Sequence, residues 1–269
     1  MALVLPEAAM PCNQVSSVQR MPDATLFALQ WAGLVAQVRL FGTNAPRATL
    51  IETDGMVASV MPAAPTSSLM NVALAVDATA PPTALASLGE QFRQGGARKW
   101  GLWVDAEDRA AGHTASAQGM VLDSRPAGMV AQLHQLPFSE APARRAVDLA
   151  SVGRINDRAY GYPEPKLAPP IAALSDHALT YGAEHAGELA SVALALDIES
   201  DTAAWFVATL PHARGNGLAR QILQRLLLDA RERGQRTASL QASTAGKPLY
   251  ERLGFITAGR LHLYEERFA

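Results

Sequence analysis

The sequence predicts an α/β protein built from two halves that repeat one order of elements. Apolar runs of strand length alternate with longer amphipathic segments, and the alternation occurs twice along the 269 residues. The connection at residues 136–143 contains two prolines and a Ser-Glu pair, which is typical of a boundary. We therefore expect one domain over residues 1–137 and a second over residues 138–269.

The first half is predicted to begin with an apolar helix at residues 24–40. Strand-length runs follow, then a helical pattern and a further strand. The expected strands are residues 48–53, 55–60, 70–76 and 99–104, with a helix at 83–93. Residues 129–133 are expected to close this half as a strand.

The second half returns to the same order. Residues 144–160 favour a helix, because apolar side chains recur on one face. Strands are expected at residues 178–184, 189–198 and 203–210, with hairpin turns at Gly187-Glu188 and Ser200-Asp201. A helix running to Gly234, a strand at 237–243 and a short helix from Lys247 complete the half.

Composition limits the possible partners. There are 23 Lys and Arg against 25 Asp and Glu, a net charge of −2, and no basic run, so bulk charge favours neither nucleic acid nor a membrane surface. The lone Cys12 excludes an internal disulfide, and no histidine or acidic group has metal-ligand spacing. The first ten residues lack signal-peptide features, and no apolar stretch is expected to approach the ~18 residues of a membrane span. We therefore expect a cytoplasmic protein without a metal; its oligomeric state is not indicated.

A glycine-containing loop links the strand at 203–210 to the next helix. Gly215 and Gly217 allow a tight turn, and the helix carries its apolar face from Leu218 to Ala230. Unpaired N–H groups and the positive end of the helix dipole would converge there on a phosphate. The alternative is an ordinary strand-to-helix turn in which glycine only relieves strain.

The spacing of further residues is specific. Arg214, Gly217 and Ala219 follow a strand, and Tyr250, with Gly254-Phe255, follows the next one. This arrangement resembles the GNAT superfamily of acyl-CoA-dependent N-acyltransferases from about residue 140 to the end. The first half is similar, by element order alone, to the degenerate N-terminal copy of tandem members. The resemblance implies two tandem GNAT-like domains, each a mixed, mostly antiparallel sheet flanked by helices.

The resemblance also implies roles for individual residues. Tyr250 would lie near the thioester sulfur of acetyl-CoA and protonate the departing thiolate, although a packed core tyrosine is the alternative. Ser243 stands where the family often has an asparagine that contacts CoA. The residues expected to hold the pyrophosphate are Arg214, Gly215, Asn216, Gly217, Leu218 and Ala219, and those expected to bond the pantetheine arm are Val207, Ala208 and Thr209.

The acceptor side is less defined by sequence. By resemblance, Asn156, Tyr160 and Tyr162 would line the acceptor pocket. If the hairpin turns at Ser200-Asp201, Thr209 lies opposite about Val192, far from Glu199. The candidates for a general base or substrate contact near the splayed strand are Tyr181, Glu184, His185 and Ser191, and a water chain is equally open. The acceptor is expected to be a primary amine, on a small molecule or a peptide.

The first half lacks the phosphate-binding loop. Residues 77–82 hold two prolines and no glycine, and proline removes N–H donors. The sequence thus predicts an N-acetyltransferase whose second half binds acetyl-CoA. The alternative is a non-catalytic acyl-CoA sensor in which Tyr250 is structural. An ATP site is disfavoured, because no Lys-Ser/Thr pair follows the glycines.

Overall fold

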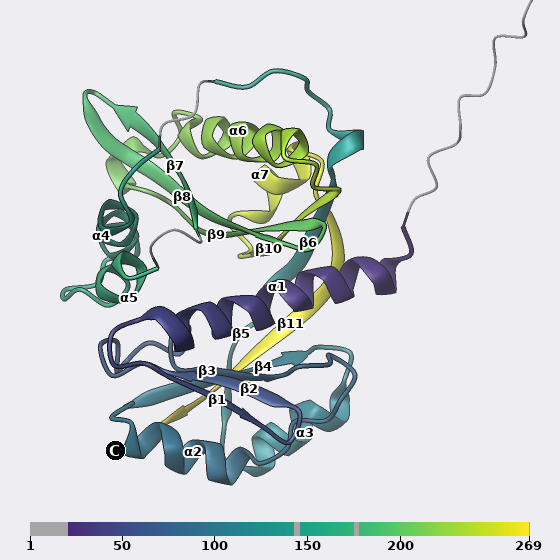
Figure 1. The fold of residues 1–269 in the computed structure, drawn as a ribbon, viewed down its shortest axis with the longest axis vertical. Helices are drawn as coiled ribbons and strands as arrows, with labels where there is room; N and C mark the ends of the chain where they lie inside the picture. Colours follow the sequence, from purple (N-terminus) through teal and green to yellow (C-terminus); the bar gives the residue numbers. More distant parts are fainter. Residues whose placement is uncertain (1–20, 143–145, 175–177, 269) are drawn as a thin grey trace, which may run out of the picture.

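The computed structural model describes residues 21–142, 146–174 and 178–268, and its strands form two mixed sheets that are joined because they share the last strand, with helices packed on them (Figure 1). The first half comprises α1 (Asp23–Asn44), β1 (Thr49–Thr53), β2 (Met56–Val60), β3 (Val72–Ala75), α2 (Leu85–Gln94), β4 (Lys99–Asp105), α3 (Arg109–Ala117), β5 (Val121–Ser124) and β6 (Ala127–Gln132). The second comprises α4 (Leu149–Tyr160), α5 (Ala168–Ala172), β7 (Leu179–His185), β8 (Glu188–Ile198), β9 (Asp201–Thr209), α6 (Leu218–Glu232), β10 (Thr237–Ala242), α7 (Lys247–Arg252) and β11 (Ile256–Arg267).

These elements confirm the helices and strands predicted from periodicity. Four were not predicted, namely α3, β5, α5 and β11. The helix expected from residue 144 begins at Leu149, where Asp148 caps it by accepting the Ser151 N–H at 2.8 Å. Residues 144 and 145, Cys12 and the first ten residues lie outside the described residues.

Both halves repeat one topology, and each inserts a strand into the other. In the second half β9 runs parallel to β10, and β6 lies antiparallel between β10 and β11. In the first half β3 runs parallel to β4, and the end of β11 lies antiparallel between β4 and β5. The two sheets are thus copies of one arrangement that have exchanged strands, which agrees with the duplicated architecture predicted from element order.

The exchange corrects the expected place of one strand. Residues 129–133 were expected to close the first half, but β6 pairs with β10 and β11. Met129 and Ala131 are buried in the core beneath α6, together with Leu223 and Leu240. The boundary between residues 137 and 138 stays a prediction, and strand pairing crosses it in both directions.

Helix α1 lies between the two sheets (Figure 1). It packs on β1 and β2 of one sheet and on β6, β9 and β10 of the other. A Cβ on Gly33 would lie 3.3 Å from Ala203 and from Ser239, so glycine permits close approach to β9 and β10. The first half therefore packs directly against the strands where the second half is expected to bind its ligand.

The apolar character of α1 also corrects a sequence expectation. This 22-residue helix is long and apolar enough, by length and composition, to cross a membrane, so the expectation that no stretch approaches that length is wrong. Only Thr25, two glutamines and Arg39 interrupt its apolar residues between positions 24 and 41. In this fold Trp31, Leu34 and Phe41 are buried in the core.

A buried carboxyl fixes the point where β9 and β10 pair. Asp201 is 2% exposed and accepts hydrogen bonds from the hydroxyls of Thr237 (2.7 Å) and Ser239 (2.6 Å) on β10. Burial raises the pKa of the Asp201 carboxyl to about 6, although these hydrogen bonds oppose the shift. The folded protein therefore holds this proton more tightly than the unfolded chain does.

This pKa predicts how stability depends on pH. Because the folded-state pKa is raised from 3.8 to about 6, the free energy of unfolding should fall as pH rises through that interval and level off above it. The contribution is up to roughly 3 kcal/mol, at about 1.4 kcal/mol per unit of pKa. Asp201→Asn should remove this part of the slope, as measured by urea unfolding between pH 4 and 7.

Asp148→Asn is the matched control. The hydrogen bonds from Ser151 lower the pKa of the Asp148 carboxyl, so its loss should weaken stability at neutral pH and not in acid. An unchanged slope in Asp201→Asn would contradict the assignment.

Candidate active site

The site begins where β9 and β10 separate. Asp201, Thr202 and Ala203 pair with residues 237–239 of β10, and no further pairing joins the two strands within the described residues. Beyond Ala203 the β9 edge that faces β10 has lost its strand partner, which leaves backbone groups for another extended chain. This is the divergence that the resemblance implied for the pantetheine arm.

A bulge in β9 maintains the separation. The register against β8 shifts between Val192 and Leu194, and Phe206 has a left-handed φ of 52°. Such a backbone costs roughly 1 kcal/mol or more for a residue with a Cβ, so its surroundings must hold it. The Asn156 Nδ2 donates to the Phe206 carbonyl at 3.1 Å, and the Phe206 ring meets the edge of Phe41 from α1.

Asn156 therefore has a different position from the one expected. It is 0% exposed and does not line the cavity described below. Its amide also donates to the Val152 carbonyl of its own helix at 2.9 Å. Its contacts indicate that it positions the bulge. The β8–β9 turn also lies one residue earlier than expected, at Glu199 and Ser200, so Thr209 opposes Ser191.

The loop before α6 presents a row of free donors. Gly215 and Gly217 have φ values of 82° and 74°, which only glycine adopts without strain. Within the described part of the chain, no N–H group from Gly215 to Arg220 donates a hydrogen bond to a backbone or side-chain acceptor. No side chain caps the helix, so these donors and the helix dipole remain available for an anion.

Arg214 holds this loop in place. Its guanidinium donates to the Thr209 carbonyl at the end of β9 (3.2 Å) and to the Ala159 carbonyl of α4 (3.0 Å). These bonds connect the loop to the strand and helix on either side of it. A direct contact from this guanidinium to a phosphate stays a prediction, as do the backbone contacts of Asn216, Leu218 and Ala219.

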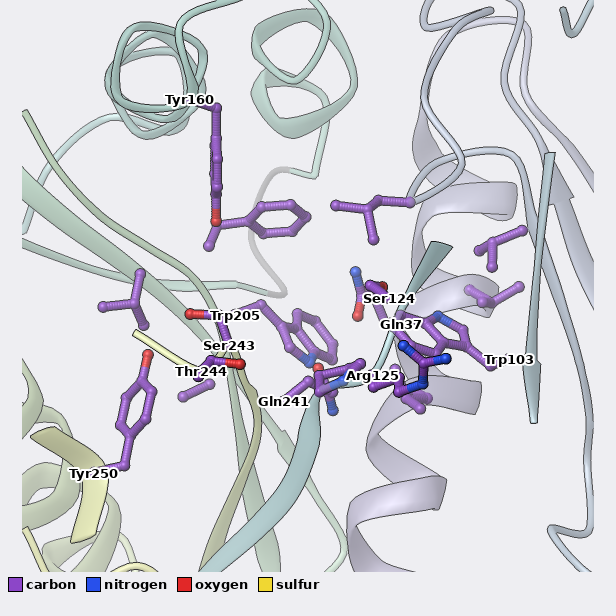
Figure 2. A pocket seen from close by; sticks show the side chains of 18 residues that line it. Gln37, Trp103, Ser124, Arg125, Tyr160, Trp205, Gln241, Ser243, Thr244 and Tyr250 are labelled. Atoms are coloured by element: carbon purple, nitrogen blue, oxygen red, sulfur yellow. The ribbon is translucent and has the colours of Figure 1, made fainter. Parts of the chain in front are cut away.

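Tyr250 points its hydroxyl into the cleft (Figure 2). Its ring is 8% exposed and packs edge-on against Phe255, while no described residue makes a hydrogen bond to the hydroxyl. Burial, and to a smaller extent the neighbouring Tyr160, raises the pKa of the Tyr250 phenol above its ordinary value of about 10. The phenol is therefore protonated at neutral pH and free to donate.

The turn that carries Tyr250 is built by Ser243. Its hydroxyl accepts the Gly246 N–H at 3.2 Å, and its carbonyl accepts the N–H groups of Gly246 and Lys247. Pro248 lies in the first turn of α7, where no N–H donor is needed. Ser243 also lines the cavity, so it can contact a ligand there while it holds the turn.

A cavity of about 440 Å³ extends from Tyr250 into the space between the two halves (Figure 2). The second half contributes β9 from Ala204 to Val207, the end of β10 and Tyr160. The first half contributes Gln37 from α1, Trp103 from β4, and Ser124 and Arg125 from the β5–β6 connection. Sequence reasoning missed these first-half residues, because only the packing of the halves brings them to the cleft.

The other residues expected near the acceptor are divided by the fold. Tyr160 lines the cavity and is 55% exposed, whereas Tyr162 stacks on it with ring centroids 5.9 Å apart and is not in the wall. Tyr181 is buried in the core beneath α6, and Glu184 is an exposed residue on the edge strand β7. Neither of these two lines the cavity.

The cavity wall offers no evident base. Among the described residues that line it there is no aspartate, glutamate or histidine. His185 lies on β7 and is not in the wall, and Ser191 is fully buried with its hydroxyl 2.8 Å from that of Thr209. The described residues also contain no group of three or more His, Cys, Asp or Glu placed to hold a metal ion.

The corresponding cleft of the first half is lined by acidic side chains. β3 and β4 pair only at two positions, and beyond them lies a hollow of about 600 Å³ lined by Asp77, Asp105 and Glu107. The Asp77 carboxylate accepts the Thr79 N–H at 2.9 Å. Carboxylates here repel phosphate, which adds to the loss of donors at Pro81 and Pro82.

Comparison with known proteins agrees with this geometry. Residues 176–257 match the family model of the acetyltransferase (GNAT) domain, and this segment contains the loop, the diverging strands and Tyr250. The second half carries a GNAT domain. The match identifies this segment as a GNAT acyltransferase domain. No curated protein sequence matches the chain.

Solved structures show the same fold over most of the chain. A GCN5-related N-acetyltransferase from Kribbella flavida is 18% identical, with 87% of this chain and 95% of that one covered and a TM-score of 0.64. Another from Sphaerobacter thermophilus is 17% identical over 79% and 76% of the two chains, with a TM-score of 0.55. A tandem GNAT protein from the clavulanic acid biosynthesis pathway is 15% identical over 91% and 95%, with a TM-score of 0.53. The predicted fold of two tandem GNAT-like domains is confirmed.

The loop geometry predicts the effect of one substitution in the GNAT domain. Gly217→Glu places a carboxylate among the free N–H groups, so affinity for CoA should fall on the order of 10²-fold, as measured by calorimetry. Gly234→Glu is the matched control, since Gly234 follows the other end of α6 with a left-handed φ of 89° and open space around it. Equal CoA affinity in the two variants would contradict a phosphate site at the loop.

The charge of the two clefts predicts the stoichiometry. We expect one CoA per chain, because the first-half cleft is acidic and its turn contains two prolines. Calorimetric titration of the full chain should give one site, and Gly217→Glu should show that same site weakened on the order of 10²-fold. Two sites in the parent, or one site of unchanged affinity in Gly217→Glu, would place a ligand in the first half.

Proposed function

We propose that this protein transfers an acetyl group from acetyl-CoA directly to a primary amine. The observation that carries the proposal is the position of the Tyr250 hydroxyl, which has no hydrogen-bond partner among the described residues and lies in the wall of a cavity that the separated part of β9 also lines. A ligand with its pyrophosphate at Gly215–Ala219 and its arm along residues 207–209 would bring its thioester toward this hydroxyl. Ser243 would contact the same ligand from the other strand.

The reaction follows from these positions. The amine nitrogen attacks the thioester carbonyl, and the negative charge on its oxygen is met by a backbone N–H of the separated part of β9. The carbon–sulfur bond then breaks, the electron pair leaves on sulfur, and the Tyr250 phenol gives its proton to that thiolate. The amine loses one proton to water, and tyrosine regains its own from solvent.

The missing base indicates how the amine is deprotonated. Because no acid or histidine lines the described cavity wall, the neutral amine enters from solution or loses its proton through water. An amine of low pKa is then favoured, because a larger fraction of it is neutral near pH 7. The alternative, a non-catalytic acyl-CoA sensor, does not explain why the Tyr250 hydroxyl is free or why a cavity extends beyond it.

Replacement of the phenol tests the reaction. Tyr250→Phe keeps the ring and its packing on Phe255 but removes the proton donor, so the single-turnover rate should fall on the order of 10²-fold with CoA affinity unchanged. Tyr181→Phe is the control, because it removes a tyrosine hydroxyl from the core of the same domain and away from the cavity.

Two outcomes would contradict parts of this proposal. Equal single-turnover rates for Tyr250→Phe and the parent would assign Tyr250 to packing and thiolate departure to water. Binding of acetyl-CoA without acetylation of any amine in a broad panel would favour the sensor.

A further inference from the structure

The far end of the cavity, away from Tyr250, carries one charged side chain. Figure 2 shows Arg125 across the cavity from Tyr250, on the same side as Gln37, Ser124 and Trp103. Arg125 is the only charged residue among the described residues of the wall. This end of the wall therefore carries a positive charge, and no carboxylate lines the wall beside it.

The guanidinium of Arg125 has no hydrogen-bond or ion-pair partner among the described residues. Across residues 21–142, 146–174 and 178–268, it makes no hydrogen bond or ion pair, and neither do the side chains of Gln37 and Ser124. An arginine is well suited to bind a carboxylate, because its planar fork matches the two oxygens. Three polar side chains without partners thus meet at one end of a largely apolar cavity.

The backbone presents Arg125 in a fixed position. Ser124 pairs with Leu263 of β11, and the carbonyl of Pro126 accepts the Leu261 N–H at 3.0 Å. The proline ring also restricts the backbone on either side of the arginine. The connection between β5 and β6 is therefore held to the exchanged strand at both of its ends, and Arg125 projects from a short segment of few conformations.

We propose that the acceptor is a primary amine that also bears an anionic group, a carboxylate in the first instance, which Arg125 pairs at the first-half end of the cavity. The inference rests on the proposed function, because it assumes that the amine reacts beside Tyr250. Trp103 and the aliphatic side chains of α1 would contact the apolar body between the two ends. The positive end and the lack of acids exclude a diamine as the preferred acceptor.

Amines of one length and different end charge test this directly. We would compare ε-aminocaproate, its carboxamide, aminohexyl phosphate and hexamethylenediamine, in which the reacting amine is far from the other end and has a similar basicity. The acid should have a KM at least about tenfold below that of its amide, with similar kcat, and the diamine should be poorest. The phosphate arm distinguishes the two kinds of anion, and equal KM values for acid and amide would overturn the proposal.

Variants of Arg125 locate the effect. Arg125→Gln should raise KM for ε-aminocaproate about tenfold or more and leave KM for its carboxamide unchanged, whereas Arg125→Lys should keep part of the preference. Added salt should weaken the preference in the parent, since the guanidinium is exposed to solvent. Arg109→Gln removes the same charge from an exposed site in α3 and should change nothing. The same KM for the acid in Arg125→Gln and the parent would overturn the assignment.

A binding measurement separates this inference from the reaction. Trp103 and Trp205 both line the cavity, so intrinsic fluorescence of the full chain should report ε-aminocaproate binding without turnover. Binding that depends on Arg125 in a protein that acetylates no amine would overturn the reaction and support the anion site. Turnover of amines without regard to their end charge would support the reaction and overturn the anion site.

Discussion

The end of backbone pairing between β9 and β10 is the constraint on which the site depends. Three register positions join the strands, and the Asp201 carboxyl bonds two hydroxyls of β10 at that point. Above it, the left-handed Phe206 and the buried amide of Asn156 hold β9 away from its neighbour. If the ladder continued, backbone groups that now face the cleft would bond each other, and no extended ligand could enter.

The two halves contribute different parts of the site and differ in the charge of their clefts. The second half supplies the glycine loop, the separated strands and Tyr250. The first half keeps the same topology, but its own cleft is acidic, and it contributes α1, β4 and the β5–β6 connection to the cavity of the other half. Duplication followed by strand exchange thus gives the degenerate copy a clear role, because it forms the outer wall of the cavity.

Local patterns in the sequence predicted most of the fold and part of the site. The periodicity of α6 and the glycines before it were sufficient to place the loop, and α7 follows the expected turn. The pattern missed α3, whose residues are small or polar and include no large apolar side chain. It also assigned β6 to the wrong sheet, since pairing partners are not encoded in the strand itself. Asn156 was expected in the acceptor pocket, and Arg125 was not predicted as a site residue. The roles of both depend on contacts with residues distant in sequence.

The strand β11 has a further consequence for how the cavity can behave. Its first residues pair with β6 in one sheet and its last residues pair with β4 in the other, without a break between them. Opening the halves like a clamshell would require bending this strand and breaking ladders on both sides of the bend. The width of the cavity between the two halves is therefore fixed in the ligand-free structure. Selection among ligands then depends on shape and charge that the cavity already has before binding.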